Sequence, residues 1–253
     1  MKRKPDMRKS FVIDCLPDSA RKYQRGYAVV AVDVIRATTM AITCVALGRR
    51  CFPVPSLEAA NTMAASLPHP VMAGEVAGDR PESFEMTNSP AELSLRRDSS
   101  RPLVLLSTSG TKLIFLAEGA DRVYLACFRN YEAVARHLTR HHDRVAIIGA
   151  GSRGEFREED QMCCAWIGRC LEAAGYTAAS RETKEIVERW RGMPPEACTD
   201  GNSAKYLARS GYQKDLDFIL KHVNDLHSAF FMEGNEVREV AVEPANSIYE
   251  ACA

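Results

Sequence analysis

The chain has 253 residues, of which 46% are hydrophobic, so it carries enough apolar side chains for a packed core. Its 33 basic and 33 acidic residues leave no net charge, which argues against a nucleic acid or an anionic membrane as its partner. No apolar run reaches the length of a membrane span, and the charged start over residues 1–6 lacks the apolar stretch of a signal peptide. We therefore expect a cytoplasmic protein. The sequence leaves both a monomer and a homo-oligomer open.

Nine cysteines form an odd, irregularly spaced set without a Cys-x-x-Cys pair, so we expect reduced and mostly buried thiols. The pair His141-His142 follows a helix-like segment and is consistent with a metal site or with a plain polar loop. The plain loop is favoured, because the usual partner ligands of zinc are missing nearby.

Short apolar runs alternate with helical patterns along the first two thirds of the chain. Strands are expected over residues 11–16, 28–35, 51–55, 71–76, 102–106, 122–126 and 144–148. Helices are expected over residues 38–47, 56–67, 111–118, 131–139 and 158–174. This alternation predicts an α/β fold with a mainly parallel or mixed sheet covered by helices. The nearly continuous apolar run 28–35 is typical of a strand buried on both faces.

The last quarter has a different pattern. Helices are expected over residues 182–191 and 214–223, and the Gly-Met-Pro-Pro break over residues 192–195 lies between them. Residues 230–237 are typical of a hairpin that turns at Gly234-Asn235. We predict one α/β domain over residues 1–253, with a basic N-terminal arm over residues 1–10 and a helical C-terminal section.

Ligands of parallel sheets bind beyond the carboxyl ends of the strands, so the loops after the strands are the informative segments. The first such loop carries Asp33, Arg36, Thr38 and Thr39 ahead of a helix. A guanidinium and two hydroxyls at a helix N-terminus suit an anion. Thr38 as a helix cap and an Asp33–Arg36 ion pair would account for only part of this set.

Two further loops combine an acid with hydroxyl groups. Glu75 follows a strand behind a glycine, and the later triplet Asn88-Ser89-Pro90 is equally typical of a helix start. The loop Ser107-Thr108-Ser109-Gly110-Thr111 places four hydroxyls around a glycine between a strand and a helix. Such a loop suits a phosphate, although an over-supplied helix cap is the alternative.

The fourth loop, over residues 149–154, matches the Gly-x-Gly-x-x-Gly pattern of dinucleotide sites. The match is poor, because no helix opens at the third glycine and no acid ends a following strand. The acidic residues after this loop, which include Asp160, would repel the negative charge of a pyrophosphate. They serve either to complement a helix dipole or, through one carboxylate, to bind a cation.

Taken together, the four loops resemble those of the 2-phosphosulfolactate phosphatases of coenzyme M biosynthesis. The matching segments are Asp33 to Thr39, Gly74-Glu75, Asn88-Ser89-Pro90, Ser107 to Thr111, Ala150-Gly151, Gly154-Glu155-Phe156, Glu159-Asp160, and a late pattern at Gly211 and Asp215-Leu216. Three features depart from the family pattern: Thr87 replaces a glycine, Ser109 replaces an amide, and the loop after Glu75 differs from the family's Gly-Phe-Asp pattern.

The resemblance implies a Mg²⁺-dependent catalytic domain that hydrolyses the phosphate ester of a small acidic molecule, 2-phosphosulfolactate, to sulfolactate and phosphate. Its implied metal-binding or water-activating residues are Asp33, Glu75 and Asp160, whose hard oxygens suit Mg²⁺, and Arg36 is catalytic. Its implied substrate-binding or phosphate-binding residues are Thr38, Thr39, Asn88, Ser89, Ser107, Thr108, Ser109, Gly110, Thr111 and Gly151, with Arg153 for a second anionic group. The rival hypothesis is a non-catalytic protein that binds a phospho-metabolite or nucleotide through the same loops.

Overall fold

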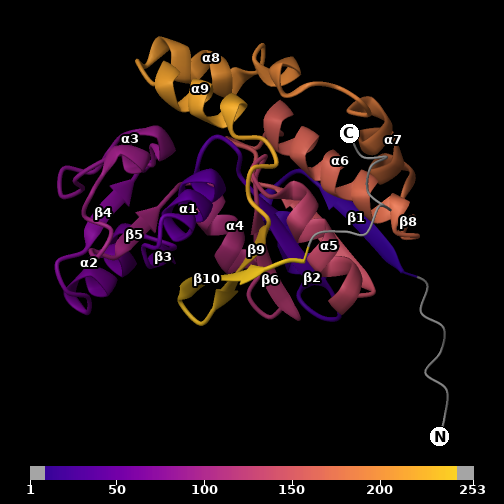
Figure 1. Cartoon of the computed structure of the whole chain (residues 1–253), viewed down its shortest axis with the longest axis horizontal. Helices are drawn as coiled ribbons and strands as arrows, with labels where there is room; N and C mark the ends of the chain where they lie inside the picture. Colours follow the sequence, from indigo (N-terminus) through magenta and orange to yellow (C-terminus); the bar gives the residue numbers. More distant parts are fainter. Residues whose placement is uncertain (1–8, 244–253) are drawn as a thin grey trace, which may run out of the picture.

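The computed structural model describes residues 9–243, which form two sheets with helices packed around them (Figure 1). The strands are β1 (Ser10–Asp14), β2 (Ala28–Val32), β3 (Cys51–Val54), β4 (Val71–Gly74), β5 (Leu103–Leu106), β6 (Arg122–Ala126), β7 (Arg144–Gly149), β8 (Thr177–Ala178), β9 (Ser228–Glu233) and β10 (Glu236–Ala241). The helices are α1 (Ala37–Ala46), α2 (Leu57–Ala65), α3 (Pro90–Leu95), α4 (Gly110–Leu116), α5 (Tyr131–His141), α6 (Glu158–Ala173), α7 (Arg181–Arg189), α8 (Asn202–Arg209) and α9 (Gln213–Lys221), with 3₁₀ turns η1 (Pro17–Tyr23) and η2 (Pro195–Cys198).

The larger sheet has the strand order β10-β9-β6-β2-β7-β1-β8, and the smaller sheet has the order β3-β5-β4. All pairs are parallel except those of β9, which runs antiparallel to both β6 and β10. The predicted α/β class with a mixed sheet is therefore confirmed, but the sequence did not indicate that the strands divide into two sheets. Pro53 lies in β3, an edge strand, where its missing N–H is tolerated.

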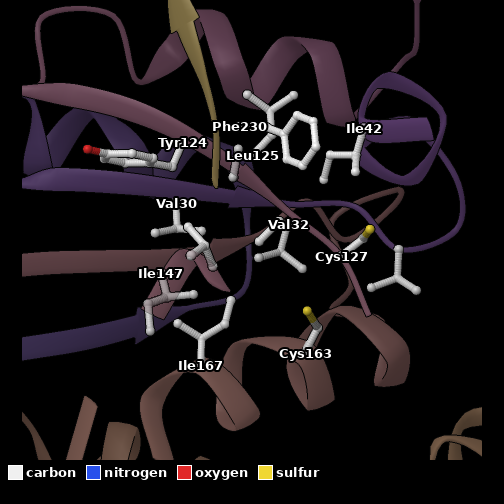
Figure 2. Close-up of a cluster of buried hydrophobic side chains, with 14 of the residues drawn as sticks. Val30, Val32, Ile42, Tyr124, Leu125, Cys127, Ile147, Cys163, Ile167 and Phe230 are labelled. Atoms are coloured by element: carbon white, nitrogen blue, oxygen red, sulfur yellow. The ribbon is translucent and has the colours of Figure 1, made fainter. Parts of the chain in front are cut away.

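The core of the larger sheet is built on β2, whose five residues are all buried. Figure 2 shows Val30 and Val32 of this strand facing Ile167 and Cys163 of α6, while Ile42 of α1 lies across the sheet. Because helices cover both faces, β2 needs apolar side chains in both directions. That is why its sequence lacks the polar alternation of a half-exposed strand.

The C-terminal section consists of the helices α7, α8 and α9 followed by the β9–β10 hairpin, and the sequence indicated α7, α9 and the hairpin. The turn of the hairpin is at Gly234-Asn235. Helix α8 was missed by the sequence analysis. It packs against α9, and α9 packs against α3, so this section reaches back to the smaller sheet (Figure 1).

Several other expectations meet the structure in part. The first eight residues of the predicted basic arm lie outside the described residues, and Ser10 already begins β1. The prediction of one domain stays a prediction. The eight cysteines of the described residues carry free thiols. Within the same residues, no helix combines the length and the apolar character that a membrane span requires.

Gly74 connects β4 to the loop that carries Glu75, and its φ of +142° lies in the region that favours glycine. A Cβ at this position would overlap the backbone carbonyl of Leu106 on the neighbouring strand. Gly74→Ala should therefore lower the free energy of unfolding by about 3 kcal/mol or more, measured by urea denaturation. The control is Gly48→Ala, where φ is +77° but no atom lies within 4 Å, and where about 1–2 kcal/mol is expected. Equal losses for the two variants would contradict a steric role of Gly74.

Candidate active site

A cavity of about 590 Å³ lies at the carboxyl ends of β2 and β7 in the larger sheet and of β4 and β5 in the smaller one. Ten of the residues singled out in the sequence line it, namely Asp33, Arg36, Glu75, Asn88, Ser107, Thr108, Ser109, Gly151, Arg153 and Asp160. Both sheets are parallel here, so all four loops leave their strands at the same side of the molecule. The cavity is therefore the candidate active site.

Asp33 closes the turn between β2 and α1. Its Oδ1 accepts a hydrogen bond from the Ala37 N–H at 3.0 Å, and its carbonyl oxygen accepts one from the Thr38 N–H at 3.0 Å. The first amides of α1 are thus satisfied by Asp33 itself. An anion at this helix end, as the sequence suggested, would have to displace a carboxylate.

Five residues predicted to contact the phosphate do not line the cavity. The Thr38 hydroxyl donates to the Ala126 carbonyl at 2.7 Å, and the Thr39 hydroxyl donates to the Val34 carbonyl at 2.7 Å. The remaining three are also engaged elsewhere: the Ser89 hydroxyl donates to Asp215, the Thr111 hydroxyl donates to the Ser107 carbonyl, and Gly110 leaves room for the Asp33 carboxylate. The structure places Thr38, Thr39, Ser89, Gly110 and Thr111 outside the cavity lining, where they support the loops, and their predicted phosphate contacts stay predictions.

Glu75 is held by the hydroxyl loop after β5. Its Oε1 accepts from the Ser107 hydroxyl at 3.1 Å and the Thr108 N–H at 2.7 Å. Its Oε2 accepts from the Thr108 hydroxyl at 2.8 Å and the Gly78 N–H at 2.7 Å. The loop that the sequence assigned to phosphate thus orients a carboxylate, while Ser109 also lines the cavity.

Asp160 lies in the first turn of α6 and bridges two loops. Its Oδ1 accepts from the Val34 N–H at 2.8 Å, and its Oδ2 accepts from the Gly151 N–H at 3.1 Å. In this glycine-rich loop the amide of Gly151 therefore serves a carboxylate of the same chain. The loop also differs from a dinucleotide site because α6 begins at Glu158 and not at the third glycine, Gly154.

The acids around the cavity carry negative charge in a poorly solvated place. Burial, with a smaller contribution from the charge of Glu75, raises the pKa of Asp33 to about 6. Burial also raises the pKa of Asp160 well above its usual range, with a further contribution from Asp33. Glu159, next to Asp160 in the first turn of α6, has both carboxylate oxygens buried, and burial raises its pKa to about 7. These groups favour either protonation or a nearby cation.

Arg36 pairs with a residue that the sequence analysis did not place in the site. Its Nη1 lies 2.6 Å from Oδ2 of Asp215, and both side chains are almost fully buried. The guanidinium also lies over the Tyr212 ring, 4.5 Å from its centroid. The Asp33–Arg36 ion pair, considered as an alternative from the sequence, is not the pair that forms. The late Asp215-Leu216 pattern was the sequence signal for this residue.

Helix α8 supplies one wall of the cavity through Asn202, Ser203, Tyr206 and Arg209. The Tyr206 hydroxyl donates to the Gly78 carbonyl at 3.1 Å and so connects α8 to the loop after β4. These residues were missed because their helix was missed. The available signal was the apolar pair Ala204 and Leu207, which are three residues apart and buried on one face.

The lining residues fit a hard cation better than a soft one, because the described residues around the cavity offer oxygen ligands and no His or Cys. Among residues 9–243, no group of three or more His, Cys, Asp or Glu is placed to hold a metal ion together. Mg²⁺ needs no such cage, since it usually binds one or two carboxylates and keeps several waters. Four carboxylates line the cavity, those of Asp33, Glu75, Glu155 and Asp160. Asp33, Glu75 and Asp160 are the ones that would bind Mg²⁺. His141 and His142 lie at the end of α5 and are not among the lining residues.

The sequence is similar to one protein family over most of its length. The family model described as 2-phosphosulpholactate phosphatase matches residues 15–227. This range includes all of the loops and helices that line the cavity. The chain belongs to the 2-phosphosulfolactate phosphatase family.

Relatives in this family each bear the name probable 2-phosphosulfolactate phosphatase. One from Pseudothermotoga lettingae is 31% identical over 80% of this chain and 87% of its own length. A relative from Symbiobacterium thermophilum is 34% identical, and one from Deinococcus radiodurans is 32% identical. In each case the match covers 86% of the relative's own length. The comparison therefore spans nearly whole proteins of this family.

The raised pKa of Asp33 makes the stability of this family member depend on pH. Between about pH 4 and pH 6 the folded chain binds more protons at Asp33 than the unfolded chain, so in EDTA the free energy of unfolding falls as pH rises. Asp33→Asn removes this loss and should stabilise the chain at pH 7.5 by on the order of 2–3 kcal/mol relative to the wild type. Near pH 3.5 the gain should vanish, because the carboxyl is then protonated in both states. Thermal melting at the two pH values checks this, and an equal gain at both would point to packing instead of charge.

Proposed function

We propose that the chain is a Mg²⁺-dependent phosphoric monoester hydrolase, with 2-phosphosulfolactate as the first substrate to test because its relatives bear that name. The observation that carries the proposal is the set of buried carboxylates with raised pKa that lines one cavity together with Arg36. A protein that only binds phosphate anions gains nothing from Asp33, Glu75 and Asp160 at its ligand, since they repel it. A hydrolase needs such acids to hold a cation and to accept a proton.

In the proposed mechanism, one or two of Asp33, Glu75 and Asp160 hold the metal. When bound, Mg²⁺ neutralises charge on the phosphoryl oxygens and lowers the pKa of bound water. The backbone amides of Val34, Ala37 and Gly151 fix the acids, so little rearrangement is needed on binding. One of these carboxylates takes a proton from the attacking water, whose oxygen bonds to phosphorus while the bond from phosphorus to the ester oxygen breaks. The ester oxygen then leaves as the alcohol after it takes up a proton from that carboxyl group or from solvent.

Arg36 is the proposed contact to the phosphoryl group. Its Nη1 is fixed by Asp215, which leaves the other guanidinium donors for phosphate oxygens. Arginine suits this task because its planar fork grips two oxygens at once. Its buried position means that the contact is made in a place of low dielectric, where it is strongest.

Two other arginines support a substrate with a further acidic group. Arg153 lines the cavity and makes no ion pair within residues 9–243, and the Nε of Arg209 donates only to the Lys205 carbonyl of its own helix at 3.3 Å. They lie on different walls, the β7–α6 loop and α8. A carboxylate or sulfonate on the substrate would pair with such free guanidiniums.

The decisive experiment is a phosphate-release assay on a panel of small phosphoesters that includes 2-phosphosulfolactate, with Mg²⁺ or with EDTA. We expect turnover with Mg²⁺, loss in EDTA, and a preference for esters that carry a second acid. Full activity in excess EDTA would contradict the metal assignment. Tight binding of a phosphoester without any phosphate release would instead support the rival, a non-catalytic binding protein.

The role of Arg36 has its own test. Arg36→Lys keeps the charge but loses the fork, so turnover should fall on the order of 10²-fold while the protein stays folded. Turnover per folded molecule is measured on the same preparation as the melting temperature. If Arg36 only anchors α9 through Asp215, the variant should melt lower and turn over at the wild-type rate.

A further inference from the structure

Asp215 is a buried residue that hydrogen-bonds to two separate segments of the chain and is not one of the residues that line the cavity. Its side chain is about 1% exposed and lies in the first turn of α9. Oδ2 accepts from Nη1 of Arg36 at 2.6 Å. Oδ1 accepts from the Ser89 hydroxyl at 2.6 Å and from the Ala91 N–H at 3.1 Å. One carboxylate of the C-terminal section thus joins the β2–α1 loop to the start of α3.

Both segments that Asp215 holds carry residues of the cavity wall. Arg36 lines the cavity itself, and Ser89 follows Asn88, which also lines it. The ring of Tyr212, just before α9, lies against the guanidinium of Arg36. The docking of α9 therefore determines where two wall residues point, although α9 itself contributes none of the lining residues in the described part of the chain.

Without Asp215, the strongest attraction on Arg36 would come from the acids of the site. Arg36 is close enough to Asp33 for its charge to lower the pKa of that carboxyl, against the larger effect of burial. A guanidinium released from Asp215 would move toward Asp33, because opposite charges attract strongly in a buried place. It would then occupy the space that a cation and a phosphate require.

We propose that Asp215 is a positioning residue that holds Arg36 toward the phosphate and away from Asp33. The C-terminal helices therefore complete the active site through a contact that no substrate touches. This inference rests on the proposed phosphatase activity. The opposing view is that the Arg36–Asp215 pair is only a buried structural ion pair, whose loss lowers stability and nothing else.

The chain offers a matched control for that view. Asp225, which follows α9, pairs with Arg129 through two hydrogen bonds of 3.0 and 2.7 Å. Arg129 is buried and lies 5.5 Å from the centroid of the Phe218 ring of α9, much as Arg36 lies over Tyr212. Neither Asp225 nor Arg129 lines the cavity. Asp225→Asn thus removes an arginine–aspartate pair of the same section away from the site, with the difference that the Asp225 side chain is 31% exposed and that of Asp215 is 1% exposed.

The experiment compares Asp215→Asn with Asp225→Asn by melting temperature, kcat and KM, and by calorimetric binding of inorganic phosphate in Mg²⁺. Both variants should melt lower than the wild type. Only Asp215→Asn should lose kcat/KM, on the order of 10²-fold, and bind phosphate more weakly. Equal kcat/KM for the two variants would overturn the positioning role. A wild type that releases no phosphate from any ester would instead refute the proposed function.

A double-mutant cycle shows whether Asp215 acts through Arg36. If it does, Asp215→Asn should cost less than about 3-fold in kcat/KM when Arg36→Lys is already present. The same loss on both backgrounds would overturn the inference. Should Asp215→Asn fail to fold, Tyr212→Leu replaces it, because it loosens Arg36 without leaving a buried charge unpaired. That variant should lose kcat/KM several-fold, and an unchanged value would count against the proposal.

Discussion

The arrangement of the site depends on the burial of negative charge at the end of β2. Asp33 follows a strand whose residues are all buried, so its carboxylate has little access to water. Backbone amides partly compensate, since Ala37 donates to Asp33 while Val34 and Gly151 donate to Asp160. Desolvation nevertheless outweighs these hydrogen bonds, and the pKa values of both acids are raised. The two carboxyl groups therefore resist ionisation, and a bound cation would favour their charged form.

The acidic residues of the cavity come from both sheets. The larger sheet contributes Asp33 and Asp160 through loops after β2 and β7, and the smaller sheet contributes Glu75 and the hydroxyl loop after β4 and β5. The cavity thus lies between the carboxyl ends of parallel strands of the two sheets. The C-terminal section then covers it from a third direction, with α8 as a wall and α9 behind Arg36 (Figure 1).

The hydroxyl groups near the site mostly organise the acids and the loops. Ser107 and Thr108 donate to Glu75, Thr38 donates to the Ala126 carbonyl, and Thr111 donates to the Ser107 carbonyl of its own loop. A hydroxyl has a single donor, so one that is already bonded to a carboxylate or carbonyl has only its lone pairs left, and these repel a phosphate oxygen. An arginine side chain carries more donors than a hydroxyl, so the proposed function assigns the phosphate contact to Arg36 and a further acidic group to Arg153 and Arg209, which all line the cavity.

The sequence by itself determined the strand–helix alternation and the loops that carry the chemistry, because buried parallel strands leave continuous apolar runs and the residues just after them face the ligand side. It therefore indicated Asp33, Glu75 and Asp160 together with Arg36. Only the tertiary structure decided which hydroxyls face inward and that Arg36 pairs with Asp215, which lies 179 residues further along the chain. Such choices follow from long-range packing. A serine that caps a helix and a serine that binds a phosphate have the same local sequence, and only the groups brought near them by the fold distinguish the two.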